Sequence, residues 1–97
     1  MANTSFHPEA QAEYEEAIGW YQVRSPQASM RFEAEVDRVI RVIESNPEIF
    51  PKCDDLHRYA VLWRFPYSIV YQHWIDHVYV IAVAHGGRLP GYWKHRT

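Results

Sequence analysis

The C-terminal part of the chain holds the residues whose types and spacing could do chemistry. In the segment His-Gly-Gly-Arg at 85–88, two glycines follow a strand-like run and free the backbone between a histidine and an arginine. His85 could exchange a proton near neutral pH, and Arg88 could hold a phosphate or carboxylate through two parallel hydrogen bonds. Tyr92 and Trp93 could stack on bases or anchor a peptide. Such a set is compatible with phosphodiester cleavage, in which a base activates a ribose 2′-OH and a cation stabilises the charged phosphorane.

The same residues also have structural interpretations. Tyr92 and Trp93 could pack the C-terminal segment back onto a sheet. Arg88 could pair with an acid such as Glu48 or Asp54, or cap backbone carbonyls. A histidine that closes a strand is often only a hydrogen-bonded structural residue. Both interpretations stay open at the level of the sequence.

Two further arginines belong to the first strand-like run. Arg58 and Arg64 are six residues apart, so they share one face if that run forms a regular strand. The shared face is either a binding surface or the solvated side of the sheet.

Metal and cofactor sites have little support. Cys53 and His57 are four residues apart, and histidines follow at 73, 77 and 85, but no C-x-x-C pair and no H-E-x-x-H motif occurs. The phosphate-binding, dinucleotide-binding and nucleophile-elbow motifs are absent, so nucleotide hydrolysis, dinucleotide chemistry and serine hydrolysis lack support. We predict no metal site and no cofactor.

The elements that position these residues belong to one small domain, which covers residues 1–97. Apolar types make up 47% of the chain and charged types 23%, a composition typical of globular proteins. The longest apolar run, Val78–Ala84, is far too short to cross a bilayer, and Met1–Ser5 lacks the pattern of a signal peptide. The single cysteine, Cys53, cannot form an internal disulfide. We therefore expect a cytoplasmic protein without a membrane partner.

Charge is distributed unevenly along the chain. Residues 1–50 carry nine acidic and four basic side chains, whereas residues 51–97 carry three acidic and six basic ones. A modest basic face on an acidic domain suits a polyanion or an acidic protein partner. It is too weak for a general nucleic-acid binder, which would be strongly basic.

Two helices open the chain. Pro8 suits a first helical turn, because its missing N–H would be unpaired there anyway. Apolar residues then recur at helical spacing until Ser25-Pro26 breaks the pattern, and a second apolar stripe runs from about Gln27 to Ser45. Asn46-Pro47 ends that helix. So short a break predicts an antiparallel helical hairpin.

From Arg58 onward the sequence becomes β-branched and aromatic. The pattern predicts strands at Arg58–Phe65, Ser68–Trp74 and Val78–Ala84, the last being the most apolar and hence central, with a further short strand near Asn3–Phe6. We expect an α+β fold in which the helical hairpin packs on a three- to four-stranded antiparallel sheet. The expected core comprises Tyr14, Ile18, Tyr21, Phe32, Val36, Val39, Ile40, Ile43, Val61, Trp63, Ile69, Tyr71, Val80 and Ala82.

Nearly the whole chain resembles the RelE/ParE superfamily of toxins from type II toxin–antitoxin modules, which includes plasmid stabilisation proteins. The resemblance begins with Phe-His-Pro-Glu-Ala at 6–10 and continues through the Asn46-Pro47 helix stop, Arg58 and Phe-Pro-Tyr-Ser-Ile-Val-Tyr at 65–71. It closes with Val-Ala-His-Gly-Gly-Arg at 83–88 and Pro-Gly-Tyr-Trp at 90–93. The order and spacing of these pieces carry the resemblance.

The resemblance implies a growth-inhibiting cytoplasmic toxin that its antitoxin neutralises. ParE-like members are not nucleases and poison DNA gyrase, whereas RelE-like members are endoribonucleases that cleave mRNA in the ribosomal A site. The acidic net charge, the His-Gly-Gly-Arg strand end, and Ser68 at a position where many members are basic all favour a ParE-like toxin. Tyr92 and Arg96, which fall roughly where RelE-like nucleases place a tyrosine and a base, favour the alternative.

The resemblance also assigns roles to the candidate residues. In a RelE-like nuclease the catalytic set would be Arg64, Arg88, Tyr92 and His85. In a ParE-like toxin the surface that binds the target would comprise Arg58, Arg64, Arg88, Tyr92, Trp93 and Arg96.

Overall fold

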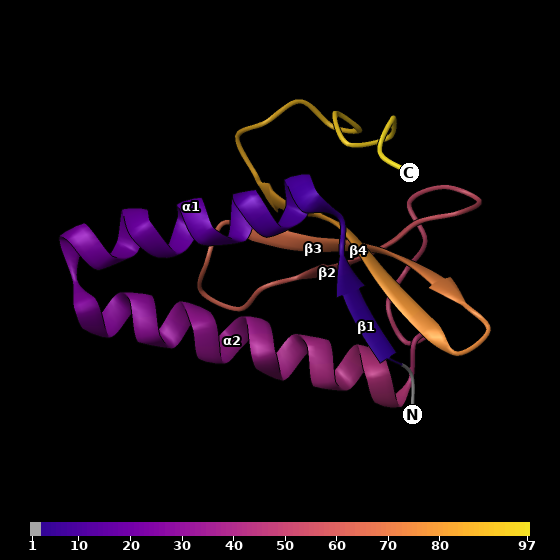
Figure 1. Ribbon diagram of the computed structural model, residues 1–97, viewed down its shortest axis with the longest axis horizontal. Helices are drawn as coiled ribbons and strands as arrows, with labels where there is room; N and C mark the ends of the chain where they lie inside the picture. The colour runs from indigo at the N-terminus through magenta and orange to yellow at the C-terminus, as the bar shows by residue number, and fades with distance from the viewer. Residues whose placement is uncertain (1–2) are drawn as a thin grey trace.

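The structure is a computed structural model that describes residues 3–97. Residues 1 and 2, which belong to the segment on which the signal-peptide expectation rests, lie outside the described residues. In chain order the elements are β1 (Asn3–Phe6), α1 (Pro8–Arg24), α2 (Pro26–Ser45), β2 (Arg58–Val61), β3 (Tyr67–Trp74) and β4 (His77–His85). Figure 1 shows the two helices running side by side along one face of the sheet. The expected α+β class is confirmed.

The break between the helices consists of one residue, Ser25. Its backbone N–H donates to the carbonyl of Tyr21 at 2.7 Å and ends α1, while its hydroxyl accepts the N–H of Ala28 at 3.2 Å and caps α2. Pro8 and Pro26 occupy the first helical positions, where no N–H is needed. The second helix therefore begins one residue earlier than the sequence pattern predicts.

The sheet is mixed rather than purely antiparallel. Its strand order is β1-β4-β3-β2, and β1 pairs with β4 in parallel, whereas the other neighbouring strands are antiparallel. As expected, the apolar strand β4 lies in the interior of the sheet. Parallel pairing of β1 and β4 is invisible in the sequence because no tight turn connects them and the whole helical hairpin intervenes.

The strand β2 is shorter than expected. It ends at Val61, and the chain then turns through Trp63 and Arg64, whose φ of 68° lies in the left-handed region. The turn closes where the N–H of Leu62 donates to the carbonyl of Tyr67 at 2.9 Å. The prediction that Arg58 and Arg64 share one strand face is therefore wrong, because the regular strand ends between them.

A β-bulge in β4 changes which side chains face the helices. Val70 pairs with Ala82 and Tyr71 pairs with Val80, so Ile81 has no partner on β3. Val80 and Val83 therefore point to the helices, while the consecutive Ile81 and Ala82 point to the opposite face. Both faces of β4 are consequently buried.

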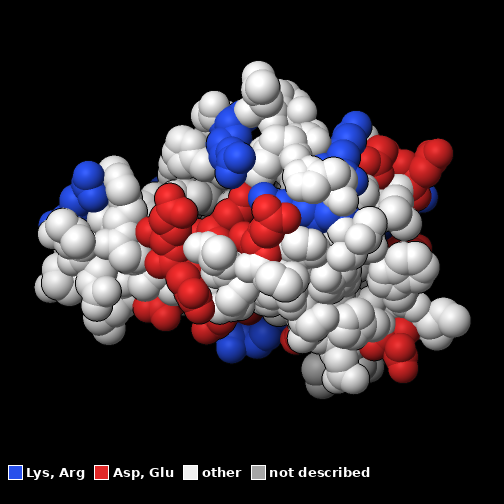
Figure 2. Space-filling model, turned by 45° about the horizontal axis from the view of Figure 1, so that its top comes forward, with Lys and Arg blue, Asp and Glu red and all other residues white. Residues whose placement is uncertain are grey.

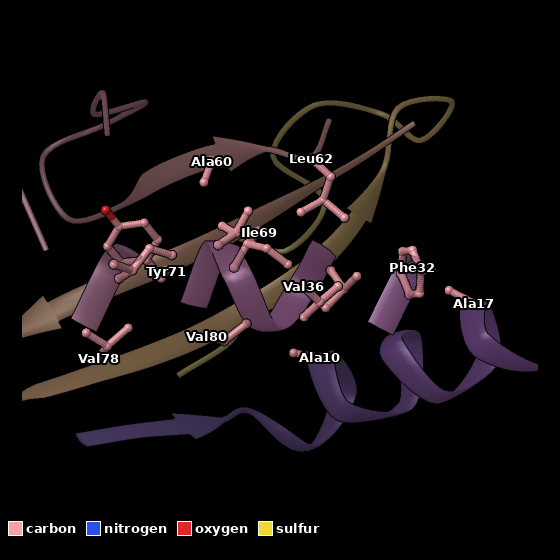
Figure 3. Close-up of a cluster of buried hydrophobic side chains, with 13 residues drawn as sticks. Ala10, Ala17, Phe32, Val36, Ala60, Leu62, Ile69, Tyr71, Val78 and Val80 are labelled. Atoms are coloured by element: carbon pink, nitrogen blue, oxygen red, sulfur yellow. The ribbon is translucent and has the colours of Figure 1, made fainter. Parts of the chain in front are cut away.

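The main core lies between the hairpin and the sheet (Figure 3). Phe32 of α2 is fully buried at its centre, and its ring centroid lies 5.3 Å from that of Tyr21, 5.4 Å from Phe65 and 5.3 Å from Tyr67. Most of the expected core is confirmed. The buried residues are Phe32, Val36, Val39, Ile43, Ile69, Tyr71, Val80 and Ala82, and the partly buried ones are Tyr14, Ile18, Tyr21 and Ile40.

Val61 and Trp63 are exceptions, because they are 63% and 66% exposed while Ala60 and Leu62 are buried in their place. A shift of one residue moves every side chain of a strand to the other face. The sequence pattern therefore assigned the wrong alternating residues of this segment to the core. No helix in the part of the chain that the structure describes is long and apolar enough to cross a membrane.

Substitution of neighbouring residues in this segment tests which face is buried. We expect Leu62→Ala to lower the free energy of unfolding by about 2–5 kcal/mol, because it leaves a cavity under the sheet. Val61→Ala should change it by about 0.5 kcal/mol or less, since that side chain is solvated. Urea denaturation of both variants measures the difference, and a larger loss for Val61→Ala would contradict this assignment of faces.

Candidate functional site

The candidate residues gather around the tail, which we define as residues 86–97. The tail leaves β4 where the N–H of Gly86 donates to the carbonyl of Pro66 at 2.8 Å, and it then crosses the sheet face that the helices leave free. Trp93 is buried there against Val70, Ile81 and Ala82. The tail thus covers the second face of the sheet, as the packing interpretation of Trp93 expects.

One acidic side chain of α1, Glu13, connects the tail to the sheet. Its carboxylate accepts hydrogen bonds from the hydroxyl of Tyr92 at 2.6 Å and from both terminal nitrogens of Arg96, at 2.9 and 3.0 Å. It also accepts the backbone N–H of Val83 at 3.0 Å and a longer bond from Arg88 at 3.3 Å. Figure 2 shows acidic and basic side chains side by side on this face of the molecule.

These contacts determine the protonation of the group. Burial raises the pKa of Glu13, but the hydrogen bonds from Arg96, Tyr92 and Val83 together lower it further, so the net shift is downward. Burial and the hydrogen bond to Glu13 raise the pKa of the Tyr92 hydroxyl, and the same carboxylate raises the pKa of Arg96. The cluster therefore holds an ionised carboxylate, a neutral phenol and a guanidinium.

Arg88 pairs with an acid, as the structural interpretation expects, but the acid is Glu13 and neither Glu48 nor Asp54. Its guanidinium carbon lies 3.7 Å from the ring centroid of Tyr92, so the side chain is stacked on the tail. About half of the Arg88 side chain remains exposed, so it can still contact a partner.

Two grooves meet at Arg88 and His85. The tail groove, of about 480 Å³, lies between the tail and the free sheet face. The helix groove, of about 390 Å³, lies between α1 and the adjoining ends of β3 and β4. No acidic residue of the described range 3–97 lines the tail groove. Its polar and charged side chains are those of Cys53, Tyr59, Ser68, His85, Arg88, Tyr92 and Lys94.

The remaining candidate arginines lie elsewhere. Arg58 donates to the backbone carbonyls of Glu48 at 3.2 Å and Phe50 at 2.7 Å, which holds the loop after α2 against β2. Arg64 stacks on the exposed ring of Trp63 at 4.4 Å. Neither arginine lines either groove. The candidate residues that the structure brings together are His85, Arg88, Tyr92 and Trp93, with the buried Arg96 next to Tyr92.

The histidine and cysteine pair considered for a metal has other partners. Asp54 binds the buried ring of His57 at 2.9 Å, and that ring lies 4.7 Å from the ring of Trp93. Cys53 donates weakly to the backbone carbonyl of His57 at 3.6 Å. Within residues 3–97, no three side chains of the metal-binding types are grouped closely enough to hold an ion.

Sequence reasoning missed Glu13 as well as Lys94 and Tyr59. Glu13 looks like one of several solvated glutamates in α1, but it lies three residues after Ala10 and four before Ala17, which are both buried. Residues at these spacings share one helix face. That spacing was the one available signal that the carboxylate points toward the sheet.

Comparison with known proteins identifies a protein family whose model matches most of this chain. The family model described as ParE toxin of type II toxin-antitoxin system, parDE, matches residues 5–90. A solved structure described as the chromosomal ParDE TA system from P. aeruginosa is similar with a TM-score of 0.74 and 13% sequence identity. The similarity covers 88% of this chain and 96% of that chain, and at this identity it establishes the fold alone. No curated protein sequence matches the chain.

Proposed function

Since the chain belongs to the ParE toxin family of type II toxin–antitoxin systems, we propose that it stops growth by binding DNA gyrase in the cytoplasm. A cognate antitoxin prevents this by binding the toxin. The proposal treats the toxin as a binding protein and not as an enzyme, and the surface that contacts gyrase is the tail groove.

The observation that carries this proposal is the engagement of Tyr92 and Arg96 by Glu13. A ribonuclease needs a group that removes the 2′-OH proton and free cations that stabilise the phosphorane. The Tyr92 hydroxyl already donates to a carboxylate, and the Arg96 side chain is 4% exposed. Arg64, the other cation of the candidate catalytic set, lies outside the groove. These positions favour a docking surface over a catalytic centre.

The composition of the tail groove suits an acidic protein surface. Its lining includes Arg88, Lys94 and His85 with no carboxylate among the described residues, although the whole chain has a net charge of −2. Tyr59, Tyr92 and the exposed Leu89 add apolar area next to these cations. A partner surface with carboxylates around an apolar centre would complement this groove.

An assay of supercoiling by purified gyrase tests the proposal. We expect the toxin to inhibit supercoiling, and Arg88→Ala/Lys94→Ala to raise the half-inhibiting concentration at least about tenfold, because interfacial charge contacts are lost. The matched control Lys52→Ala removes a cation outside the groove and should inhibit like the unmodified toxin. Normal supercoiling in the presence of excess folded toxin would refute the gyrase proposal.

A RelE-like ribonuclease is the second candidate, because His85, Arg88 and Tyr92 do line one groove. In that case His85 would accept the 2′-OH proton and Arg88 would bind the phosphate. Mapping transcript 5′ ends in cells arrested by the toxin separates the two functions. Codon-positioned cuts that disappear in Arg88→Ala, together with normal plasmid supercoiling, would establish the ribonuclease instead.

A further inference from the structure

We infer that Glu13 is a positioning residue that holds the tail on the sheet and thereby builds the tail groove. The inference rests on the proposed function, in which that groove contacts gyrase. Glu13 lies on α1 and does not line the tail groove itself. Its effect on target binding is therefore exerted through the tail.

On the edge of β4 that pairs with β1, the backbone groups after Val80 require polar partners from elsewhere. Pairing with β1 ends where Phe6 meets Val80, and the N–H of His7 donates to the carbonyl of Val80 at 2.8 Å. Beyond it, the bulge residue Ile81 has a carbonyl that accepts Arg96 at 3.0 Å, and the N–H of Val83 donates to Glu13 at 3.0 Å. Buried backbone groups are rarely left unpaired. The Glu13–Arg96 pair thus replaces the strand that is missing from this edge.

Glu13 provides the largest set of polar contacts that attach the tail to the rest of the fold. Arg96 also donates directly to the carbonyl of Ile81, and Glu9 lies 3.6 Å from Arg96 and 3.9 Å from His95. Trp93 is the apolar attachment, on the tail-side face of the sheet. Between β4 and these attachments the chain contributes much of the groove lining, including Arg88, Leu89 and Lys94. Arg88 is oriented by the ring of Tyr92 on one side and the Glu13 carboxylate on the other. If the polar attachment is lost, the groove loses both its wall and the orientation of Arg88.

Among residues 3–97, no other carboxylate accepts hydrogen bonds from both Tyr92 and Val83. Glu9 approaches Arg96 at 3.6 Å, but its side chain is 55% exposed and no hydrogen bond joins it to Tyr92 or Val83 among the described residues. Glu15, two residues after Glu13, accepts a 3.0 Å hydrogen bond from Gln11 of its own helix and has no other hydrogen-bonded side-chain partner in the part of the chain that the structure describes. It provides a matched control with the same residue type on the same helix.

The test compares Glu13→Gln with Glu15→Gln in the full-length toxin. Docking of the tail is measured without target, by hydrogen exchange at the Val83 amide and at the Arg96 amide, which donates to the carbonyl of Trp93 at 2.9 Å. For Glu13→Gln we expect the protection of both amides to fall by about tenfold, because tail opening exposes Val83 and frees the turn that contains Arg96. Glu15→Gln should match the unmodified protein in both measurements.

Inhibition of gyrase supercoiling is measured in parallel. Glu13→Gln should raise the half-inhibiting concentration at least about tenfold. Tyr92→Phe removes one contact to the same carboxylate, so adding it to Glu13→Gln should reduce the protection of the Val83 amide no further. Exchange is the measurement for this pair of variants, because Tyr92 itself lines the groove. Additive losses would indicate general destabilisation and contradict the positioning role. If Glu13→Gln does not fold, Tyr92→Phe alone is compared with Glu15→Gln in the same measurements.

The outcomes separate this inference from the gyrase proposal. An unchanged tail in Glu13→Gln overturns the inference, whatever the toxin does to gyrase. An open tail with undiminished inhibition also overturns it, while the gyrase proposal stands. If the unmodified toxin fails to inhibit gyrase, the proposed function fails, and the exchange measurements alone decide whether Glu13 holds the tail.

Discussion

Phe32→Ala is expected to lower the free energy of unfolding by about 3–5 kcal/mol. Phe32 is fully buried and joins the two layers of the fold, since its ring contacts Tyr21 of α1 as well as Tyr67 of β3 and Phe65, which precedes β3. Truncation removes buried apolar area and leaves a cavity that rigid neighbouring rings cannot fill. A domain of this size has a total stability of roughly 5–15 kcal/mol, so the loss would be a large share of it.

Urea denaturation followed by circular dichroism measures this effect. Met30→Ala is the matched control, because Met30 lies on the same helix and is 69% exposed. It should change the free energy of unfolding by about 0.5 kcal/mol or less. Equal losses for the two variants would mean that the hairpin is not packed on the sheet through Phe32.

Arg96→Ala is expected to lower the free energy of unfolding by a similar amount, for an electrostatic reason. The Glu13 side chain is 15% exposed and the Arg96 side chain 4%, so the substitution leaves a mostly buried carboxylate without its main partner. Breaking such a pair costs about 3–5 kcal/mol. The carbonyl of Ile81 also loses the guanidinium that donates to it. Urea denaturation at pH 7 measures the loss of unfolding free energy.

The pH dependence of this loss distinguishes the electrostatic cause from lost packing. In the unmodified protein the pKa of Glu13 lies below the ordinary value of 4.5, although burial opposes the shift. Its stabilisation is therefore complete above about pH 4.5 and disappears as the pH falls through the lower folded pKa. Without Arg96, burial is opposed by fewer hydrogen bonds and the pKa of Glu13 rises.

The difference between the two proteins should accordingly shrink in acid. The unmodified protein loses the contribution of Glu13 as the carboxylate is protonated, whereas the variant, whose carboxylate keeps fewer hydrogen bonds, has less of this contribution to lose. Denaturation at pH 7 and at about pH 3 measures the two differences. A loss of the same size at both pH values would show that Arg96 stabilises the tail by packing alone.

Phe32→Ala and Arg96→Ala remove contacts on different sides of the sheet. Phe32 holds the helical hairpin to one face of the sheet, and the Glu13–Arg96 pair holds the tail near the other. Because Glu13 belongs to α1, the position of the tail depends on how the hairpin is packed. We therefore expect Phe32→Ala to weaken tail docking as well, although Phe32 lies outside both grooves.

The sequence by itself determined both helices, the interior strand and the family, but it did not determine where β2 ends. Pro8, Ser25-Pro26 and Asn46-Pro47 mark the helix boundaries to within one residue, because capping and proline geometry act over a few positions. The apolar run at 78–84 identified the interior strand, because a strand buried on both faces cannot alternate with polar residues. The resemblance to RelE/ParE toxins rested on short motifs in a fixed order, and the ParE family match over residues 5–90 agrees with it.

The tertiary structure decided what those elements bring together. The parallel pairing of β1 with β4 and the side of β2 that faces the core depend on contacts with distant strands. The hydrogen bonds that Glu13 accepts from Val83 and Arg96 span 70 and 83 residues, so no local pattern contains them. Hydrophobic periodicity reports which face of an element is buried, but it does not report which buried polar groups meet. That depends on where pairing with β1 ends and on the bulge that turns the carbonyl of Ile81 toward the tail.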